Sequence, residues 1–488
     1  MINIKYLNRN YIPYIVIVIV YVTIRIFTLN NCFFWDNIQQ VSNEAHWFYL
    51  NDFKSLFIPK LDATLGISAT GYHPPLMGIT TALLWKTFGY HLWTHHIFLV
   101  LWGIILTYNL HKVLSNFFQG KYISWILTII LFESALISQF VVSSPDFILF
   151  TAFVVSFRAI IEHKKYLLTV GLFFLCCINM RGVFAGLILY IVNHYYVHLL
   201  DNHQTIRLKT IIQTSLPYLP VFFILTAYFS YYLFLNGWFF TNSAYSSHYV
   251  IPDSLSRTLK HLAEFGIRTL ENGRFFVWIL GVILVIKILQ KKIELTNEIK
   301  VVLLCLVLLN GLYFLFVFIS QMAFSARYFM PQYFLMIIFV LWGVIKLYPP
   351  KKIKLLFALI LLFHITGNLW VYPDKIAKSW DTTLSHLSYY RLREKCFEYL
   401  DCHQYDYNEV SAGFCLYGNR KYIELIGENK KIGHDPNRKY FIYSNISNLE
   451  DDFVDDIKDP QKWHLIKTFK KNFIEISLYE NMKVTNTH

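Results

Sequence analysis

Charged residues are scarce in this sequence. They make up 15% of its 488 residues and hydrophobic residues make up 55%, whereas soluble domains carry about 25% charged residues. This balance excludes a large soluble core and predicts an integral membrane protein. The formal net charge of +13 does not indicate a nucleic-acid partner, because much of the basic excess lies in short loops between apolar segments, where it sets membrane orientation.

Motifs for nucleotides, metals and serine hydrolysis are also missing. The sequence has no Gly-rich phosphate loop, no Ser/His/Asp order and no nucleotide fingerprint, so a donor already embedded in the membrane is favoured over a nucleotide-activated one. The seven cysteines show no CxxC or Cys/His spacing, and a divalent metal cofactor has no support. One pair among Cys396, Cys402 and Cys415 could form a disulfide if the tail lies outside the cytoplasm.

Eleven apolar segments are candidates for membrane spans, which need about 20 apolar residues. No small-residue cleavage site follows the first segment, which is therefore interpreted as an uncleaved signal anchor. The expected fold is a polytopic α-helical membrane protein with about eleven spans, its N-terminus in the cytoplasm and its C-terminus outside. The segments are roughly 11–28, 94–111, 122–142, 146–162, 166–180, 182–200, 212–236, 275–290, 300–320, 328–347 and 353–371.

The stretch 74–89, within "GYHPPLMGITTALLWKTFGY", is a doubtful twelfth segment because it is short and opens with Pro-Pro. If it does not cross the bilayer, loops rich in lysine such as 164–165, 291–292 and 351–354 lie in the cytoplasm, as the positive-inside rule requires. If it crosses, these loops move outside. The charge pattern therefore predicts that 74–89 lies along the outer interface or dips into it, within a first outer loop of residues 30–93.

The composition changes near Pro373. Residues 373–488 are polar, with alternating runs "KYFIYSNIS" and "NFIEISLYE" that predict strands. The preceding "TLSHLSYYRLREKCFEYLDCH" has helical periodicity. We therefore expect two domains, a membrane domain over 1–372 and a soluble α/β domain over 373–488 on the extracytoplasmic side.

Two acidic residues are placed to take part in catalysis at the outer face. Asp36 in "FFWDN" directly follows the first span beside three aromatic residues, which places a carboxylate at the membrane surface, where it suits a general base. On position alone, an interfacial aromatic anchor followed by a solvated aspartate is the simpler explanation. Asp146 in "SSPDFILF" begins an apolar helix, where helix capping alone would explain it. Asn37, Glu44 and His46, in the same loop as Asp36, are candidates for supporting the site or contacting an acceptor, and their spacing predicts no fixed metal.

The candidate phosphate ligands are His73, Arg181, Arg274 and Arg327. Each lies near the end of an apolar segment, where snorkelling to lipid headgroups is the simpler explanation for any one of them. Several that converge on one face could instead bind a phosphate, since arginine donates paired hydrogen bonds to it. Glu133, predicted in the middle of the helix 122–142, is a functional candidate for which the sequence offers no partner.

In their order along the chain, these motifs resemble the GT-C glycosyltransferases, specifically the protein O-mannosyltransferase and aminoarabinose transferase branch. The matching stretches are "FFWDN", "GYHPPL" with "LLWKTFG", "SSPDFILFTAFVVSFRAI", "NMRG" and "ARYFMP", within residues 10–348. The resemblance implies an inverting transferase that uses a polyprenyl-phosphate sugar on the extracytoplasmic side of a bacterial cytoplasmic membrane. It also implies that Asp36 is the catalytic carboxylate.

The sequence departs from the family at two places. The family often has Asp-Glu where this chain has Asp36-Asn37, and aminoarabinose transferases carry a lysine where this chain has His73. We expect Asp36 to deprotonate an acceptor hydroxyl on a lipid, protein or glycan while the basic residues stabilise the departing polyprenyl phosphate. The alternatives are a transporter or lipid flippase, a glycan polymerase or ligase, and a receptor or scaffold in which the tail is the functional part.

Overall fold

The structure, a computed structural model, describes residues 12–54, 58, 73–200, 208–237, 251–320, 323–371, 380–426, 429–447 and 449–485. Parts of the predicted first loop (55–57 and 59–72) and the predicted domain boundary (372–379) lie outside the described residues. The chain divides into two compact units. The helical unit comprises Met1–Phe27, Gly71–Leu76 and Ile97–Gly367, and the mixed unit comprises Thr28–Thr70, Met77–His96 and Asn368–His488.

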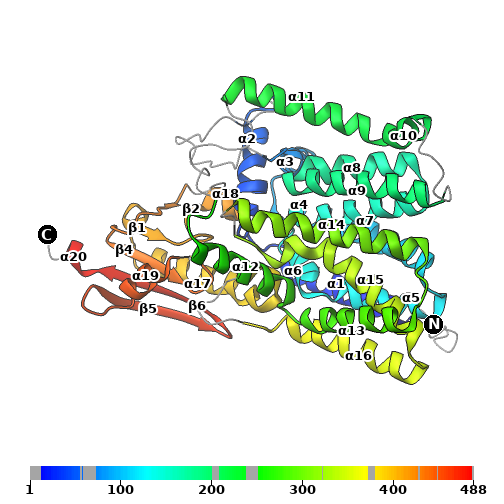
Figure 1. Ribbon diagram of the computed structural model, residues 1–488. Coiled ribbons are helices and arrows are strands. Elements are labelled where there is room, and N and C mark those ends of the chain that lie inside the picture. The colour runs from blue at the N-terminus through cyan, green and yellow to red at the C-terminus, as the bar shows by residue number, and fades with distance from the viewer. Residues whose placement is uncertain are drawn as a thin grey trace, which may run out of the picture. The chain divides into compact units, whose positions relative to one another are not determined.

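All eleven segments predicted as spans are helical. Among the described residues, four helices are long and apolar enough to cross a membrane, or up to six if each of two bent pairs is counted as one span. The predicted count of eleven is therefore not confirmed. The helices (Figure 1) are α1 (Ile12–Thr28), α4 (Leu92–Phe117), α5 (Gly120–Leu131), α6 (Ser134–Val141), α7 (Pro145–Ile161), α8 (Lys165–Ile178), α9 (Met180–Leu200), α10 (Leu208–Ser215), η4 (Leu216–Tyr218), α11 (Leu219–Asn236), α12 (Leu255–Leu270), α13 (Phe275–Lys291), α14 (Asn297–Ile319), η6 (Ala326–Phe329), α15 (Met330–Leu347) and α16 (Pro350–Gly367).

The centre of the helical unit is formed by α7 and α15. Every residue of α7 is buried, and so is nearly every residue of α15, which is the pattern of an interior helix that is apolar all round. Other helices expose large apolar side chains: Phe234 on α11 is 84% exposed and Leu289 on α13 is 71% exposed. Exposed apolar surface of this kind requires a lipid environment, so the chain is a multi-pass membrane protein.

The predicted helix over 122–142 is broken, which corrects the expectation of one continuous span. The axes of α5 and α6 differ by 62°. The Glu133 side chain accepts hydrogen bonds from the backbone N–H groups of Ala135 and Leu136, at 3.2 and 2.9 Å. Glu133 is thus the N-cap of a new helix and does not lie in the middle of one.

Residues 76–88 form a short separate helix, α3 (Leu76–Phe88). Thirteen helical residues span about 20 Å, whereas the hydrocarbon core of a bilayer is about 30 Å thick. All of α3 but its first residue belongs to the mixed unit. These observations agree with a segment that does not cross, while its side of the membrane stays a prediction.

The mixed unit contains a four-stranded sheet of order β1-β4-β6-β5. Strand β1 (Val410–Ala412) pairs in parallel with β4 (Tyr440–Ser444), and the other two pairs, formed with β6 (Ile474–Asn481) and β5 (Trp463–Lys471), are antiparallel. The predicted strands in "KYFIYSNIS" and "NFIEISLYE" are confirmed as β4 and β6. The predicted helix is confirmed as η8 (Leu384–Leu387) followed by α17 (Ser388–Cys402).

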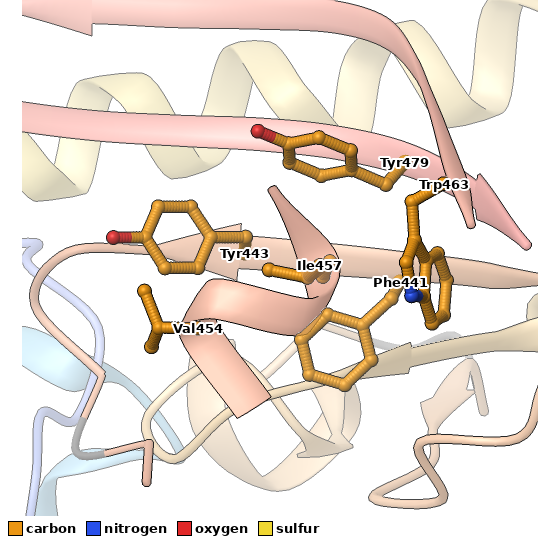
Figure 2. Packing of buried hydrophobic residues seen from close by; sticks show 6 residues of the cluster. All are labelled: Phe441, Tyr443, Val454, Ile457, Trp463 and Tyr479. Atoms are coloured by element: carbon orange, nitrogen blue, oxygen red, sulfur yellow. The ribbon is translucent and has the colours of Figure 1, made fainter. Parts of the chain in front are cut away.

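Alternating side chains of β4 build the core on one face of this sheet. Phe441 and Tyr443 pack with Tyr479 from the adjacent strand β6, with Trp463 from β5 and with Ile457 from α19 (Asp451–Ile457), as Figure 2 shows. The period of two places these β4 residues on one face. The smaller elements are η3 (Ile38–Asn43), α2 (Glu44–Leu50), η7 (Trp380–Thr382), η9 (Tyr407–Glu409), β2 (Gly418–Asn419), α18 (Arg420–Glu424), β3 (Lys431–Ile432) and α20 (Met482–Thr485). All seven cysteines are free, so no disulfide joins Cys396, Cys402 or Cys415.

Candidate functional site

Asp146 lies at a tightly built corner before α7. Ser143 has a φ of 57°, and the Ser144 hydroxyl caps the helix by accepting a hydrogen bond from the Asp146 N–H at 3.1 Å. Arg25, which is buried, donates to the Ser143 hydroxyl at 3.0 Å and to the Phe140 carbonyl at 2.5 Å. The corner therefore fixes the direction in which the Asp146 carboxylate points.

Two arginines share this carboxylate. Arg181 Nη2 lies 2.6 Å from Asp146 Oδ1, and Arg327 Nε lies 3.1 Å from Oδ2. The Asp146 and Arg327 side chains are only 5% and 6% exposed. Because two guanidinium groups face one carboxylate, the cluster carries a net charge of +1. The sequence predicted all three residues, and the structure brings them together.

The local structure holds both arginines in place. The Asn179 side chain caps the start of α9 by accepting from the Arg181 N–H at 3.0 Å. Arg327 lies on the 3-10 turn η6, just before α15. The ring of Tyr328 lies beneath both groups, with its centroid 3.8 Å from Arg181 Cζ and 5.3 Å from Arg327 Cζ. Stacking on an aromatic face leaves the edges of a guanidinium available for hydrogen bonds to an anion.

A small pocket of about 20 Å³ opens beside these arginines. That volume is room for about one water molecule or one ligand oxygen. Gln332 on α15 lines the pocket and is fully buried, and neither atom of its amide has a hydrogen-bond partner among the described residues. A buried amide without partners is costly unless a ligand or water supplies them. Besides the two arginines and Gln332, the lining residues are Leu149, Phe184, Ala185, Leu309, Leu312, Tyr313, Phe316, Tyr328 and Pro331.

Gln332 is not among the site residues predicted from the sequence. It is an uncharged residue in the apolar run that follows "ARYFMP", whereas every predicted site residue except Asn37 is ionisable. The available signal was its position, five residues after Arg327 at the start of a helix. That position turns its side chain to the same pocket.

Arg274, a predicted phosphate ligand, pairs with Glu133 and not with Asp146. Its Nε is 2.8 Å from Glu133 Oε1, both side chains are buried, and Arg274 Cζ lies 4.9 Å from the centre of the Tyr333 ring. Its Nη1 donates to the Ala326 carbonyl at 2.7 Å. Arg274 therefore neutralises Glu133 and contacts the backbone next to Arg327, and its predicted contact with a phosphate gains no support from this geometry.

His73 lies near the start of α9. Its Nδ1 accepts a hydrogen bond from the Met180 N–H at 3.5 Å, and its carbonyl accepts from the Tyr228 hydroxyl at 3.3 Å. Burial, aided by the positive charge of Arg181, lowers the pKa of His73 to about 3. The imidazole is neutral at pH 7 and carries its proton on Nε2. In this form it is a hydrogen-bond donor, and its contact with a phosphate stays a prediction.

Asp36 belongs to the mixed unit, whereas Asp146 belongs to the helical unit. Asp36 is half-buried and follows Trp35, whose φ is 51°. Its carbonyl accepts from the N–H groups of Gln39 and Gln40 at 3.1 and 2.8 Å, where the π-helix η3 begins. Short π-helical segments are frequent at functional sites. Asn37, the N-cap of η3, is buried.

Glu44 and His46 are buried in the same loop. Burial raises the pKa of the Glu44 carboxyl well above its usual range, and burial lowers the pKa of His46 to about 3. His46 contacts the Ser42 carbonyl through Nδ1 at 2.6 Å and the Tyr90 hydroxyl through Nε2. Burial thus disfavours the charged form of both groups, and the two contacts of His46 link Ser42 to Tyr90. Within the described residues, no group of three or more His, Cys, Asp or Glu could hold a metal ion.

No known family model and no curated protein matches this sequence. Two similar solved structures are of ArnT from Cupriavidus metallidurans. The form bound to undecaprenyl phosphate matches with a TM-score of 0.52 and 9% identity, over 96% of this chain and 97% of that one. The apo form matches with a TM-score of 0.50 and 10% identity over the same shares. The chain therefore has the fold of ArnT, an aminoarabinose transferase of GT-C type, and the predicted resemblance is confirmed for the fold.

Proposed function

We propose that this chain is a membrane glycosyltransferase that moves a sugar from a polyprenyl-phosphate donor to an acceptor hydroxyl, with inversion at the anomeric carbon. The observation that carries the proposal is the pair of arginines on Asp146, which leaves one positive charge beside a pocket at the end of α7. ArnT, which has the same fold, has been solved with undecaprenyl phosphate. The negative charge of a lipid phosphate is complementary to the positive charge of the two arginines on Asp146.

In the proposed mechanism, Arg181 and Arg327 bind the phosphate that leaves. Charge-assisted hydrogen bonds from guanidinium groups are strong and directional, and in a buried site they stabilise the charge that develops on the leaving oxygen. The Gln332 amide supplies a further donor and acceptor next to them. Asp146 has one arginine at each oxygen, so its role is to position these basic groups. It is not the base.

Asp36 is the proposed general base. As the acceptor oxygen attacks the anomeric carbon, Asp36 takes its proton, and the bond from that carbon to the phosphate oxygen breaks with its electron pair remaining on the phosphate. A sugar thus gains a new glycosidic bond and polyprenyl phosphate is released. The site of this reaction is proposed to lie on the extracytoplasmic side of a bacterial cytoplasmic membrane.

A transporter would carry charged residues near the bilayer midplane, and Glu133 is the clear acidic candidate for such a position in the sequence. In the structure Glu133 is paired with Arg274 and caps α6. An ion pair that also serves as a helix cap explains the buried charge by its structural role. Glu133 therefore no longer favours transport.

The proposal is tested in a deletion strain rescued with wild-type protein, Asp36→Asn or Asp52→Asn. Asp52 lies in the same loop but is exposed and paired with Lys86, which makes it the matched control. Mass spectrometry of lipid extracts should show one polyprenyl-phosphate sugar accumulating in the deletion and Asp36→Asn strains, together with loss of one sugar modification. Normal modification in an Asp36→Asn strain with wild-type protein levels in the membrane would refute the assignment.

A further inference from the structure

The C-terminal part of the mixed unit contains a second pocket, of about 690 Å³. None of its lining residues belongs to the proposed transferase site. They come from η9 and the residues before it, from β2 and α18, and from the segment that leads into β3. The lining residues are Tyr405, Asp406, Tyr407, Asn408, Asn419, Lys421, Tyr422, Asn429, Lys430 and Lys431.

The side chains that line this pocket are aromatic or polar. Among the ten described residues that form it, three are tyrosines, three are asparagines and three are lysines, and none is aliphatic. A lipid chain or an apolar small molecule would find no aliphatic surface here, whereas ligand pockets for such molecules are mostly apolar. Flat tyrosine rings beside amide groups can instead contact the two faces and the hydroxyl groups of a sugar ring.

Hydrogen bonds within the protein hold the walls in place. The Tyr407 hydroxyl donates to Asp401 at 2.9 Å and accepts from Arg420 at 2.8 Å. Lys430 pairs with the same Asp401 at 2.8 Å, and the Asn419 amide donates to the Asn429 side chain at 2.5 Å. A pocket whose walls are fixed before binding loses less entropy when a ligand arrives.

The charge of the pocket is positive. Lys421 and Lys431 form no ion pair with any residue that the structure describes, in contrast to Lys430. The pocket's one acidic residue, Asp406, already caps η9 by accepting from the Asn408 N–H at 2.9 Å. Two ammonium groups are thus available to a ligand that carries negative charge.

We propose that this pocket binds an anionic carbohydrate, a sugar chain that bears carboxylate or phosphate groups. The tyrosine rings and asparagine amides bind the sugar, and Lys421 and Lys431 bind its acidic groups. The inference goes beyond the proposed transferase activity and does not depend on it, because it concerns binding to the tail and is measured without turnover. It assigns the C-terminal domain a role in recognising an acidic glycan.

The test is isothermal titration calorimetry on the full-length protein in phosphatidylcholine nanodiscs. The probes are trigalacturonate, which is an acidic trisaccharide, maltotriose as its neutral counterpart, and inorganic phosphate. Trigalacturonate should bind, more weakly at 0.5 M than at 0.1 M salt because exposed charges are screened. Binding of maltotriose or of phosphate alone with equal affinity would overturn the proposal, because either result would show that sugar and charge are not recognised together.

Variants locate the binding. Lys421→Gln/Lys431→Gln should weaken trigalacturonate binding by at least about tenfold, since two charge-assisted contacts are lost. Lys467→Gln/Lys471→Gln, on the exposed strand β5, removes the same charge elsewhere in the same domain and should change affinity less than about twofold. Equal losses in the two double variants would contradict the proposal. Tyr405→Ala provides a second test that leaves the net charge unchanged, and undiminished binding by a folded Tyr405→Ala protein would also contradict it.

Discussion

Arg274 donates a hydrogen bond from Nη1 to the carbonyl oxygen of Ala326, over 2.7 Å. Ala326 directly precedes Arg327, so the fully buried Arg274, the N-cap residue of α13, supports the backbone that presents an arginine of the candidate site. Arg274 Nε also forms an ion pair with Glu133 Oε1 over 2.8 Å. The Glu133–Arg274 pair and the Asp146 cluster are therefore linked through η6.

The first prediction concerns the Glu133–Arg274 pair. Either Glu133→Gln or Arg274→Met leaves one buried charge without its partner, which typically costs about 3–5 kcal/mol. The double variant removes both charges and should recover part of that loss, giving a measurable coupling energy in a double-mutant cycle. Thermal unfolding of the four purified proteins in one detergent measures it. Additive losses in the double variant would show that the two residues do not act as a pair.

The second prediction concerns the Arg327 guanidinium. Arg327→Lys keeps the charge but removes the planar group that can bind Asp146 and a phosphate together. Losing a hydrogen bond to a charged group costs about 1.5–3 kcal/mol, so kcat/KM for the polyprenyl-phosphate donor should fall roughly ten- to hundredfold. Arg257→Lys, in an exposed pair with Asp253, is the control and should retain full activity. An Arg327→Lys enzyme as active as that control would exclude a donor role for Arg327.

Much of the fold followed from hydropathy and alternation. All eleven apolar segments are helical, and both alternating runs of the tail are strands. These patterns are local, because each residue's burial repeats with the period of its own helix or strand. The break at Glu133 was not predicted. Hydropathy averages over a window of residues, so it does not reveal that one side chain caps a new helix, α6, directly after α5 ends.

The site was predicted less completely, for a related reason. Asp146, Arg181 and Arg327 were chosen because the topology placed all three on one face. The pairing of Arg274 with Glu133 joins residues 141 positions apart, and nothing in the sequence near either residue specifies it. Gln332 was missed because it is uncharged, and only the arrangement of α9, α14 and α15 around one pocket gives it significance.

The third prediction concerns Gly182, next to Arg181. A Cβ atom at Gly182 would lie 1.7 Å from the Leu175 carbonyl oxygen, so α8 and α9 approach closely only because this residue has no side chain. Gly182→Ala should lower stability by about 1–3 kcal/mol through overpacking, and should lower activity by moving Arg181. Gly311→Ala, in α14 with open space around the site of the new Cβ, should be neutral or slightly stabilising. The measurements are thermal unfolding and donor turnover of both variants. Equal stability and equal turnover in the two variants would contradict a close contact between α8 and α9 at Gly182.

The fourth prediction concerns pH. Burial lowers the pKa of His46 to about 3 and that of His386 to about 4, whereas unfolded histidine titrates near about 6.5. Between these values the unfolded state binds more protons, so stability falls as the pH drops below about 6.5, by up to about 1.4 kcal/mol per pH unit for each such histidine. His46→Gln should make this decline shallower, and His464→Gln on β5 is the exposed control. Thermal unfolding measured from pH 7.5 to 5 gives the slopes, and identical slopes for the two variants would rule out the contribution of His46.

The last prediction separates binding from stability at Gln332. Its buried amide has no partner among the described residues, and each unsatisfied buried polar group costs about 1–3 kcal/mol. Gln332→Leu removes that cost at similar volume, so the free protein should unfold at the same temperature or a higher one. The same change removes a proposed contact to the donor, so the KM for polyprenyl-phosphate sugar should rise about tenfold.

Ser156→Ala is the control for Gln332→Leu. The Ser156 hydroxyl is also buried without a partner in the described part of the chain, but it does not line the pocket. Its removal should leave both donor KM and turnover unchanged. A Gln332→Leu protein that is less stable than wild type would mean that the amide has partners within the folded protein. An unchanged KM would mean that the amide does not face the donor. The proposed pattern of retained stability and weakened donor use is expected only if the ligand completes the hydrogen bonds that the fold leaves open.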